Sequence, residues 1–268
     1  MLKVERFSFF IIFLLLVGCQ PTTPFQHYSV NYPKTEKVTF NVELNDLDIE
    51  IFSTQDPEIN ITYDDLISDQ KKIIIDYQEG IFTISSQDKI SPRTMQIMLP
   101  PGCNITLEAF NTNITLRELS GNISVHTIAG DISASNLTGQ VSLKSARGDV
   151  TLNNSHGVLS VLGEHGIITL YSNHGMLNAA TIMGTIHFSG QIFTGDDIFL
   201  ETDRGPVIAT LMDVEDVFIN VWTTNGTVTC MVDQIEMTSV TCKHSPSSPQ
   251  GKFQVKTVWG TIQVKAQK

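Results

Sequence analysis

The chain has 268 residues, of which 28 are acidic and 17 basic, and its net charge is −11 with neutral histidines. An acidic chain of this kind gains nothing from a phosphate backbone, so we exclude nucleic acid as a partner. The length is sufficient for one large core or one elongated domain.

The first nineteen residues, MLKVERFSFFIIFLLLVGC, predict a lipoprotein signal peptide over 1–18. Two basic residues, Lys3 and Arg6, precede an apolar run that is too short to span a bilayer comfortably. The run ends in Leu-Val-Gly-Cys, which resembles the bacterial lipobox, and the resemblance implies cleavage before Cys19 and a lipid anchor on its sulfur. The alternative is an ordinary signal peptide, or a buried apolar strand, with an incidental cysteine.

The next segment, 19–35, is polar and dotted with prolines and shows no hydrophobic periodicity. We therefore expect a tether that lifts the folded body from the membrane. The body is predicted as a single domain over 36–268. Its first part contains alternating runs such as VTFNVELNDLDIEIF and IFTIS, which indicate strands that cap the core and cover its exposed edge.

A nine-residue spacing organises residues 103–192. Eight glycines stand nine residues apart from Gly121 to Gly184, and two earlier blocks in the same register begin at Cys103 and Thr112. The third and fifth places of all ten blocks are apolar, whereas the fourth is Ser or Thr in all blocks except those with Asn178 and His187. Alternation at spacing two predicts a strand with one buried face.

A short strand repeated every nine residues, with a glycine at each bend, predicts an all-β fold: a single-stranded parallel β-solenoid, or β-helix. The pattern leaves open whether two or three blocks complete one coil. Two blocks are favoured, because Asp131 and Asp149 recur at eighteen residues. The spacing loosens after Gly184 and returns at Gly251 and Gly260, so we expect the solenoid to continue with inserted loops.

Three cysteines remain beyond Cys19. Cys230 and Cys242 flank a twelve-residue separation next to a proline-containing loop, so we predict a disulfide that pins the loop. Cys103 is then left as a free thiol, buried at the start of the regular core.

Two kinds of metal site could fit the repeat. Calcium-binding nonapeptide repeats need acidic loops in every repeat, and most blocks here lack an acid. His156 and His174 would stack on one corner if a coil has eighteen residues, within reach of a divalent ion. Two imidazoles without a carboxylate or thiolate make a poor site, so solvated corner residues are the favoured interpretation and no cofactor is predicted.

The run from TMQIMLPPG through GNISVHTIAGDISASNLTGQV to KSARGDVTL resembles the putative-adhesin family of bacterial β-solenoid envelope lipoproteins. The resemblance implies an architecture without a known reaction, and Gln20 after the lipidated cysteine is similar to outer-membrane lipoproteins. We therefore expect a non-enzymatic binding or scaffolding protein, anchored in the outer membrane, with a glycan or an envelope protein as partner.

The alternative function is an envelope carbohydrate-active enzyme on a β-helix. Such enzymes need clustered carboxylates on an external face. The candidate residues for this cluster are Asp196, Asp197, Glu201 and Asp203.

Overall fold

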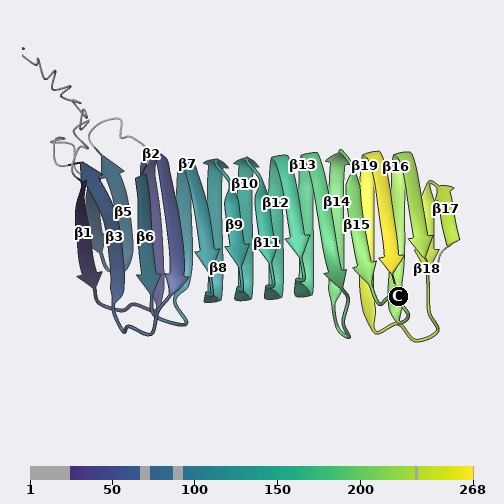
Figure 1. Ribbon diagram of the computed structural model, residues 1–268, viewed down its shortest axis with the longest axis horizontal. Coiled ribbons are helices and arrows are strands. Elements are labelled where there is room, and N and C mark those ends of the chain that lie inside the picture. The colour runs from purple at the N-terminus through teal and green to yellow at the C-terminus, as the bar shows by residue number, and fades with distance from the viewer. Residues whose placement is uncertain (1–24, 67–72, 87–92, 233–234, 268) are drawn as a thin grey trace, which may run out of the picture.

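The computed structural model describes residues 25–66, 73–86, 93–232 and 235–267, and these form nineteen strands (Figure 1). The predicted signal peptide 1–18 and Cys19 lie outside the described residues. Within the described part the regular elements are all strands, and no helix there is long and apolar enough to cross a bilayer. The all-β class is confirmed.

The regular middle of the molecule stacks strands in parallel. Gly139 pairs with Gly121 on one side and with Gly157 on the other, and Val150 pairs with Ile132 and Ile168. The partners are eighteen residues apart, which is the length of two nine-residue blocks. The strands of this part are β7 (Asn104–Arg117), β8 (Ser120–Ala129), β9 (Ile132–Ser135), β10 (Thr138–Arg147), β11 (Val150–Asn153), β12 (His156–Tyr171) and β13 (His174–Gln191).

Each circuit contributes one strand to each of two walls. Wall A contains residues 104–109, 122–127, 140–145, 158–163 and 176–181, and wall B contains 113–117, 131–135, 149–153, 167–171 and 185–189. The upper edge of the molecule in Figure 1 joins wall A to wall B through 110–112, 128–130, 146–148, 164–166 and 182–184, and the lower edge returns the chain through 118–121, 136–139, 154–157 and 172–175.

The core lies between the walls because alternate side chains point inward. In β10, Val141 and Leu143 are buried while Ser142 between them is exposed. All twenty apolar positions predicted from the nine-residue blocks are no more than 2% exposed. The hydrophobic effect of these continuous aliphatic columns holds the two walls together.

The N-terminal end is covered by strands that leave the stack and return. β2 (Lys37–Ser53) runs along both walls next to β7, and β5 (Ile81–Ser86) and β6 (Arg93–Leu99) pair in parallel on its outer side. β4 (Ile73–Gln78) and β3 (Ile59–Leu66) then pair antiparallel with β5 and β6. These antiparallel pairings break the repeat and close this end, as expected of a cap.

The predicted tether is wrong in its second half. Phe25–Tyr32 form strand β1, which pairs antiparallel with β3 over its whole length. The Tyr32 ring packs against Phe82 with ring centroids 4.9 Å apart, and Phe82 stacks on Phe40 at 5.0 Å. The prolines of this segment favoured the prediction of a tether. Tyr28 and Tyr32, however, lie on the same face of a strand and pack on the cap.

The C-terminal end departs from chain order. The strands here are β14 (Asp197–Arg204), β15 (Val207–Met212), β16 (Val217–Val232), β17 (Ile235–Ser239), β18 (Thr241–His244) and β19 (Gly251–Gln267). β19, the last strand, lies between β14 and β15 on one side and β16 on the other, with parallel pairing on both sides. β17 and β18 pair antiparallel with β16 and end the stack.

Candidate functional site

The candidate site depends on a flat wall A, and stacked glycines at the lower edge produce it. Gly139 and Gly157 have φ of 122° and 130°, a region open almost only to glycine. A Cβ on Gly157 would overlap the carbonyl oxygen of Gly139 in the preceding circuit. The close approach keeps successive circuits in register, so equivalent side chains form straight columns at about 4.8 Å spacing.

A shallow groove of about 460 Å³ crosses wall A over four successive circuits and the start of β2. Two columns of polar side chains line it. The amide column is Asn104, Asn122 and Gln140, and the hydroxyl column is Thr106, Ser124, Ser142 and Ser160. We call this surface the amide–hydroxyl groove.

The groove offers many neutral hydrogen-bonding groups and very little charge. Asn104 uses its Oδ1 to accept a hydrogen bond from the Asn122 backbone N–H at 3.0 Å, while Gln140 and Ser142 are exposed to solvent. Lys37 is the one charged residue in the lining and lies at the N-terminal end of the groove, and Val158 adds apolar surface at the other end. Amides and hydroxyls both donate and accept hydrogen bonds, so the groove suits a neutral ligand rich in hydroxyl groups. Its lining holds no carboxylate or imidazole for general acid–base chemistry.

The two histidines of the possible metal site are neighbours, as the favoured coil length predicts. His156 pairs with His174 in the parallel register. His174, however, is engaged elsewhere: its Nδ1 lies 3.3 Å from Asp196 Oδ2, and its ring meets that of Phe193 with centroids 4.7 Å apart. Within the described residues, no group of three His, Cys, Asp or Glu side chains is arranged to hold a metal ion.

Two of the four candidate carboxylates of the alternative enzyme, Asp196 and Asp197, line a common pocket of about 480 Å³. Asp196 is only 5% exposed, and its carboxylate accepts hydrogen bonds from the Gly175 and Phe193 backbone N–H groups at 2.7 and 2.8 Å. This makes Asp196 a structural cap of the lower edge. On wall A, Lys252 Nζ lies 3.4 Å from Asp197, and Lys256 forms an ion pair with Glu201, while Asp203 is exposed at the end of β14.

The acids of the regular corners also have a structural role. Asp131 Oδ1 accepts a hydrogen bond from the Asp149 backbone N–H at 2.8 Å, and Asp149 Oδ1 does the same for Ile167 at 2.7 Å. The eighteen-residue recurrence of Asp131 and Asp149 therefore reflects a ladder of side chains that stabilises the bend.

A second, buried ladder is not predicted by the spacing of the blocks. Asn173 is fully buried at the lower edge, where its Nδ2 donates to the Leu152 carbonyl at 2.7 Å and its Oδ1 accepts from the Ser155 N–H at 3.0 Å. Ser155 Oγ in turn accepts from the Leu137 N–H at 3.1 Å. The available signal was the polar Ser155 and Asn173 at the place where earlier blocks carry Leu119 and Leu137.

The cysteines take the predicted arrangement in the described residues. Cys230 and Cys242 form a disulfide with Cα atoms 6.3 Å apart, which joins β16 to β18. Cys103 is free and buried. Burial raises the pKa of the Cys103 thiol, and the nearby Lys34 lowers that pKa to a smaller degree. A buried thiol of this kind is a poor nucleophile.

Comparison with known proteins gives a family and several distant structures. The sequence pattern of the Toastrack family, DUF4097, matches residues 26–265. A solved structure named a "putative adhesin" from Bacteroides fragilis is 12% identical, with 89% of this chain and 97% of that chain covered and a TM-score of 0.48. A "putative adhesin" from Parabacteroides distasonis is 9% identical, with 89% and 97% covered and a TM-score of 0.43. No sequence among the curated proteins matches the chain.

Proposed function

The chain belongs to the Toastrack family DUF4097, and from this premise we propose that it is a lipid-anchored, non-enzymatic binding protein of the bacterial cell envelope. In this proposal the domain is a parallel β-solenoid, Cys19 carries the acyl chains in the outer membrane, and the amide–hydroxyl groove binds a neutral glycan. The groove is the observation that carries the binding function.

The chemistry of the groove supports a glycan over a charged or apolar ligand. Its two columns present amide and hydroxyl groups at the spacing of the strands, so a linear chain of hydroxyl-rich units meets equivalent groups in each circuit. An open groove buries only part of such a ligand, so we expect weak contacts that gain strength from several protein copies on one membrane.

The lipid anchor is supported by the order of residues at the N-terminus. Lys3 and Arg6, the short apolar run and Gly18 precede Cys19 in the arrangement that a lipoprotein signal requires. Several acyl chains on one cysteine hold a protein on a membrane far better than a single chain does. The test is fractionation of native cells that carry the wild-type or the Cys19→Ala form, with and without globomycin. Soluble protein from the wild type would contradict the anchor.

Protease treatment of intact cells then separates two forms of the proposal. Digestion of the anchored protein by external protease supports binding at the cell surface. Protection from protease supports a scaffold inside the envelope and removes the adhesin-like form of the proposal.

Blocking substitutions test the groove. Ser124→Trp and Ser142→Trp place large rings in the hydroxyl column of wall A, and Ser133→Trp and Thr151→Trp place the same ring at the equivalent outward positions of wall B. The probe is a panel of neutral linear oligosaccharides, with binding measured by calorimetry or by ligand-observed NMR. We expect the wall A variants to lose at least about tenfold in affinity, equivalent to about 1.4 kcal/mol, and the wall B variants to bind as the wild type does. Equal loss in both pairs, or no binding by the wild type, would refute the role of the groove.

A further inference from the structure

Large apolar side chains are exposed along the upper edge of the stack. Five of them are between 38% and 58% exposed: Phe110, Ile128, Ile182, Met183 and Trp259. The lower-edge segments 118–121, 136–139, 154–157 and 172–175, all within the described residues, expose no large hydrophobic side chain. Within residues 104–184 the exposed large apolar side chains of the edges, Phe110, Ile128, Ile182 and Met183, are all at the upper edge, and Trp259 extends this row, whereas Phe193 is exposed beside His174 of the lower edge. The contrast within 104–184 marks the upper edge as an interaction surface.

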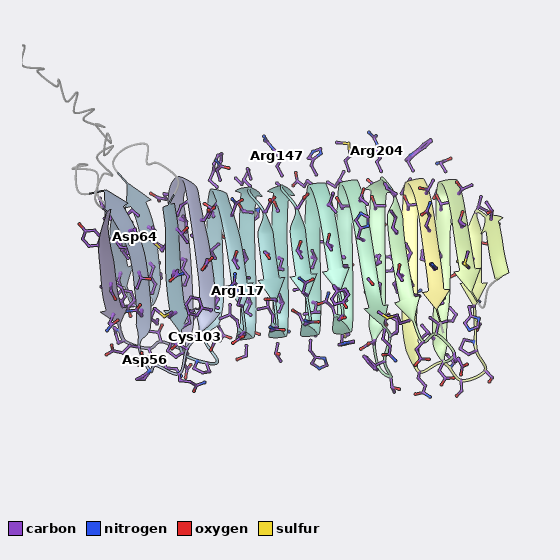
Figure 2. The ribbon with its side chains drawn as sticks, viewed as in Figure 1. Asp56, Asp64, Cys103, Arg117, Arg147 and Arg204 are labelled. Carbon is purple, nitrogen blue, oxygen red and sulfur yellow. A yellow bond between two sulfur atoms is a disulfide. The ribbon has the colours of Figure 1, made fainter. Side chains whose placement is uncertain are left out.

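Cationic side chains accompany this apolar row. Arg147 pairs with His165, and the same column continues through Met183 and Arg204 to Trp259. Figure 2 shows Arg147 and Arg204 at the upper edge, and both are exposed. The column is bordered by the acids Glu164 and Asp203, each one residue earlier in the chain. The corner acids Asp131 and Asp149 follow the same edge, so the edge carries charges of both signs and is not a net cationic surface.

The described chain begins at this same edge. β1 starts at the upper end of the molecule in Figure 1 and runs downward. The β3–β6, β6–β2 and β2–β7 pairings place Tyr63 level with Ile114. Phe25 pairs with Leu66, three residues beyond Tyr63 toward the upper edge, where Asn111 lies. Cys19 precedes Phe25 by six residues. An extended chain of six residues reaches at most about 20 to 22 Å.

We propose that the upper edge lies on the bilayer that holds the acyl chains of Cys19, so that the long axis of the molecule is parallel to the membrane surface. This inference rests on the lipid anchor of the proposed function. Tryptophan and other apolar side chains favour the headgroup region, and arginines there meet the phosphates of anionic lipids. Wall A, with the amide–hydroxyl groove, then stands upright and remains open to solvent.

The distance between Phe25 and Trp259 distinguishes this arrangement from simple tethering. Ten strand pairings separate β1 from β19 along the stack, which corresponds to about 48 Å. An anchor at the β1 end alone leaves Trp259 far from the membrane. Contact of Trp259 with lipid therefore requires the whole upper edge to lie against the membrane surface.

The chain offers a matched internal control, because it has only two tryptophans. Trp222 is in β16, next to β19 in the stack, but it is half-buried on wall A in register with Lys256. It precedes the upper-edge residue Asn225 by three positions, about 10 Å along the strand. The two tryptophans are thus at nearly the same distance from the anchor and at different heights above the proposed membrane surface.

The experiment uses the mature, lipidated chain in vesicles of phosphatidylglycerol and brominated phosphatidylcholine, whose bromines quench nearby tryptophans. The Trp222→Phe protein reports on Trp259, and the Trp259→Phe protein reports on Trp222. We expect quenching by brominated lipid to reduce Trp259 emission about twofold or more and to leave Trp222 emission nearly unchanged. Met183→Asp should relieve the quenching of Trp259, and Thr138→Asp at the lower edge should not.

The outcomes separate this inference from the proposed function. Protein that floats with the vesicles while Trp259 stays unquenched, or while both tryptophans are quenched equally, overturns the orientation and leaves the anchor intact. Protein that does not float with the vesicles overturns the anchor and the orientation with it.

Discussion

Replacement of Gly157 by alanine tests the glycine stacking that aligns the two walls. The φ of 130° at Gly157 lies in a region that costs a residue with a side chain about 1 to 3 kcal/mol. The added Cβ would also overlap the Gly139 carbonyl oxygen, which is backbone and has no rotamer to escape into. The circuits above and below must therefore move apart and lose packing, and this adds about 1 to 3 kcal/mol. We expect a total loss of about 2 to 6 kcal/mol in the free energy of unfolding.

Gly102→Ala is the matched control, because Gly102 also has a positive φ, 79°, but nothing lies within 4 Å of its added Cβ. It isolates the conformational cost, about 1 to 2 kcal/mol. Urea unfolding followed by circular dichroism measures both variants, and a decrease in the midpoint at constant slope reports the loss of stability. If Gly157→Ala lowers stability no more than Gly102→Ala does, the close approach of the circuits is not what requires glycine, and our explanation of the repeat is wrong.

Three further predictions concern single positions. Asn173→Ala leaves two buried backbone groups without partners and should cost about 2 to 4 kcal/mol by urea unfolding, against almost nothing for Asn178→Ala on the exposed surface of wall A. Gly163→Ala should raise stability by about 0.4 to 1 kcal/mol in the same assay, because the φ of Gly163 is not positive and an added Cβ meets Thr181 Oγ1 at an ordinary 3.4 Å; a loss would show that the site is already full. Reduction of Cys230–Cys242 should remove about 3 kcal/mol, seen as a lower melting temperature in dithiothreitol, and a Cys230→Ser/Cys242→Ser protein should not respond to the reductant.

The regular core could be predicted from the sequence because one local rule repeats in it. An apolar residue at the third and fifth places of each block specifies which face is buried, and a slip of one residue would turn every side chain to the other face. The register therefore follows from the spacing, and the neighbouring positions of His156 and His174 follow from the register. The spacing does not indicate which groups each side chain contacts. It therefore does not predict the contact between the His174 ring and the Asp196 carboxylate.

The sequence alone predicts only one of the two polar columns that line the candidate site. The hydroxyl column follows directly from the Ser and Thr at the fourth place of the blocks. The amide column requires the length of the circuit, because Asn104, Asn122 and Gln140 occupy alternate blocks, and the blocks between them carry Asn113 and acids at the same place. With eighteen residues per circuit the two sets separate onto opposite walls, and the neutral set forms the groove.

The order of the C-terminal strands could not be predicted, because the glycine column is equally compatible with two orders. In the structure Gly205 is followed in the column by Gly260 and then by Gly226, although Gly226 comes first in the chain. The pattern of a nine-residue block specifies which of its side chains are buried and where its glycine lies along the edge. It does not specify which other block is its neighbour in the stack. β17 and β18 supply the missing information, because both pair antiparallel with β16 and the disulfide joins β18 to it. Because β17 and β18 cover the outer side of β16, the open side of β16 faces the body of the stack, and β19 fills the gap with parallel pairings on both sides. The final strand thus connects β16 and its cap to the body of the stack.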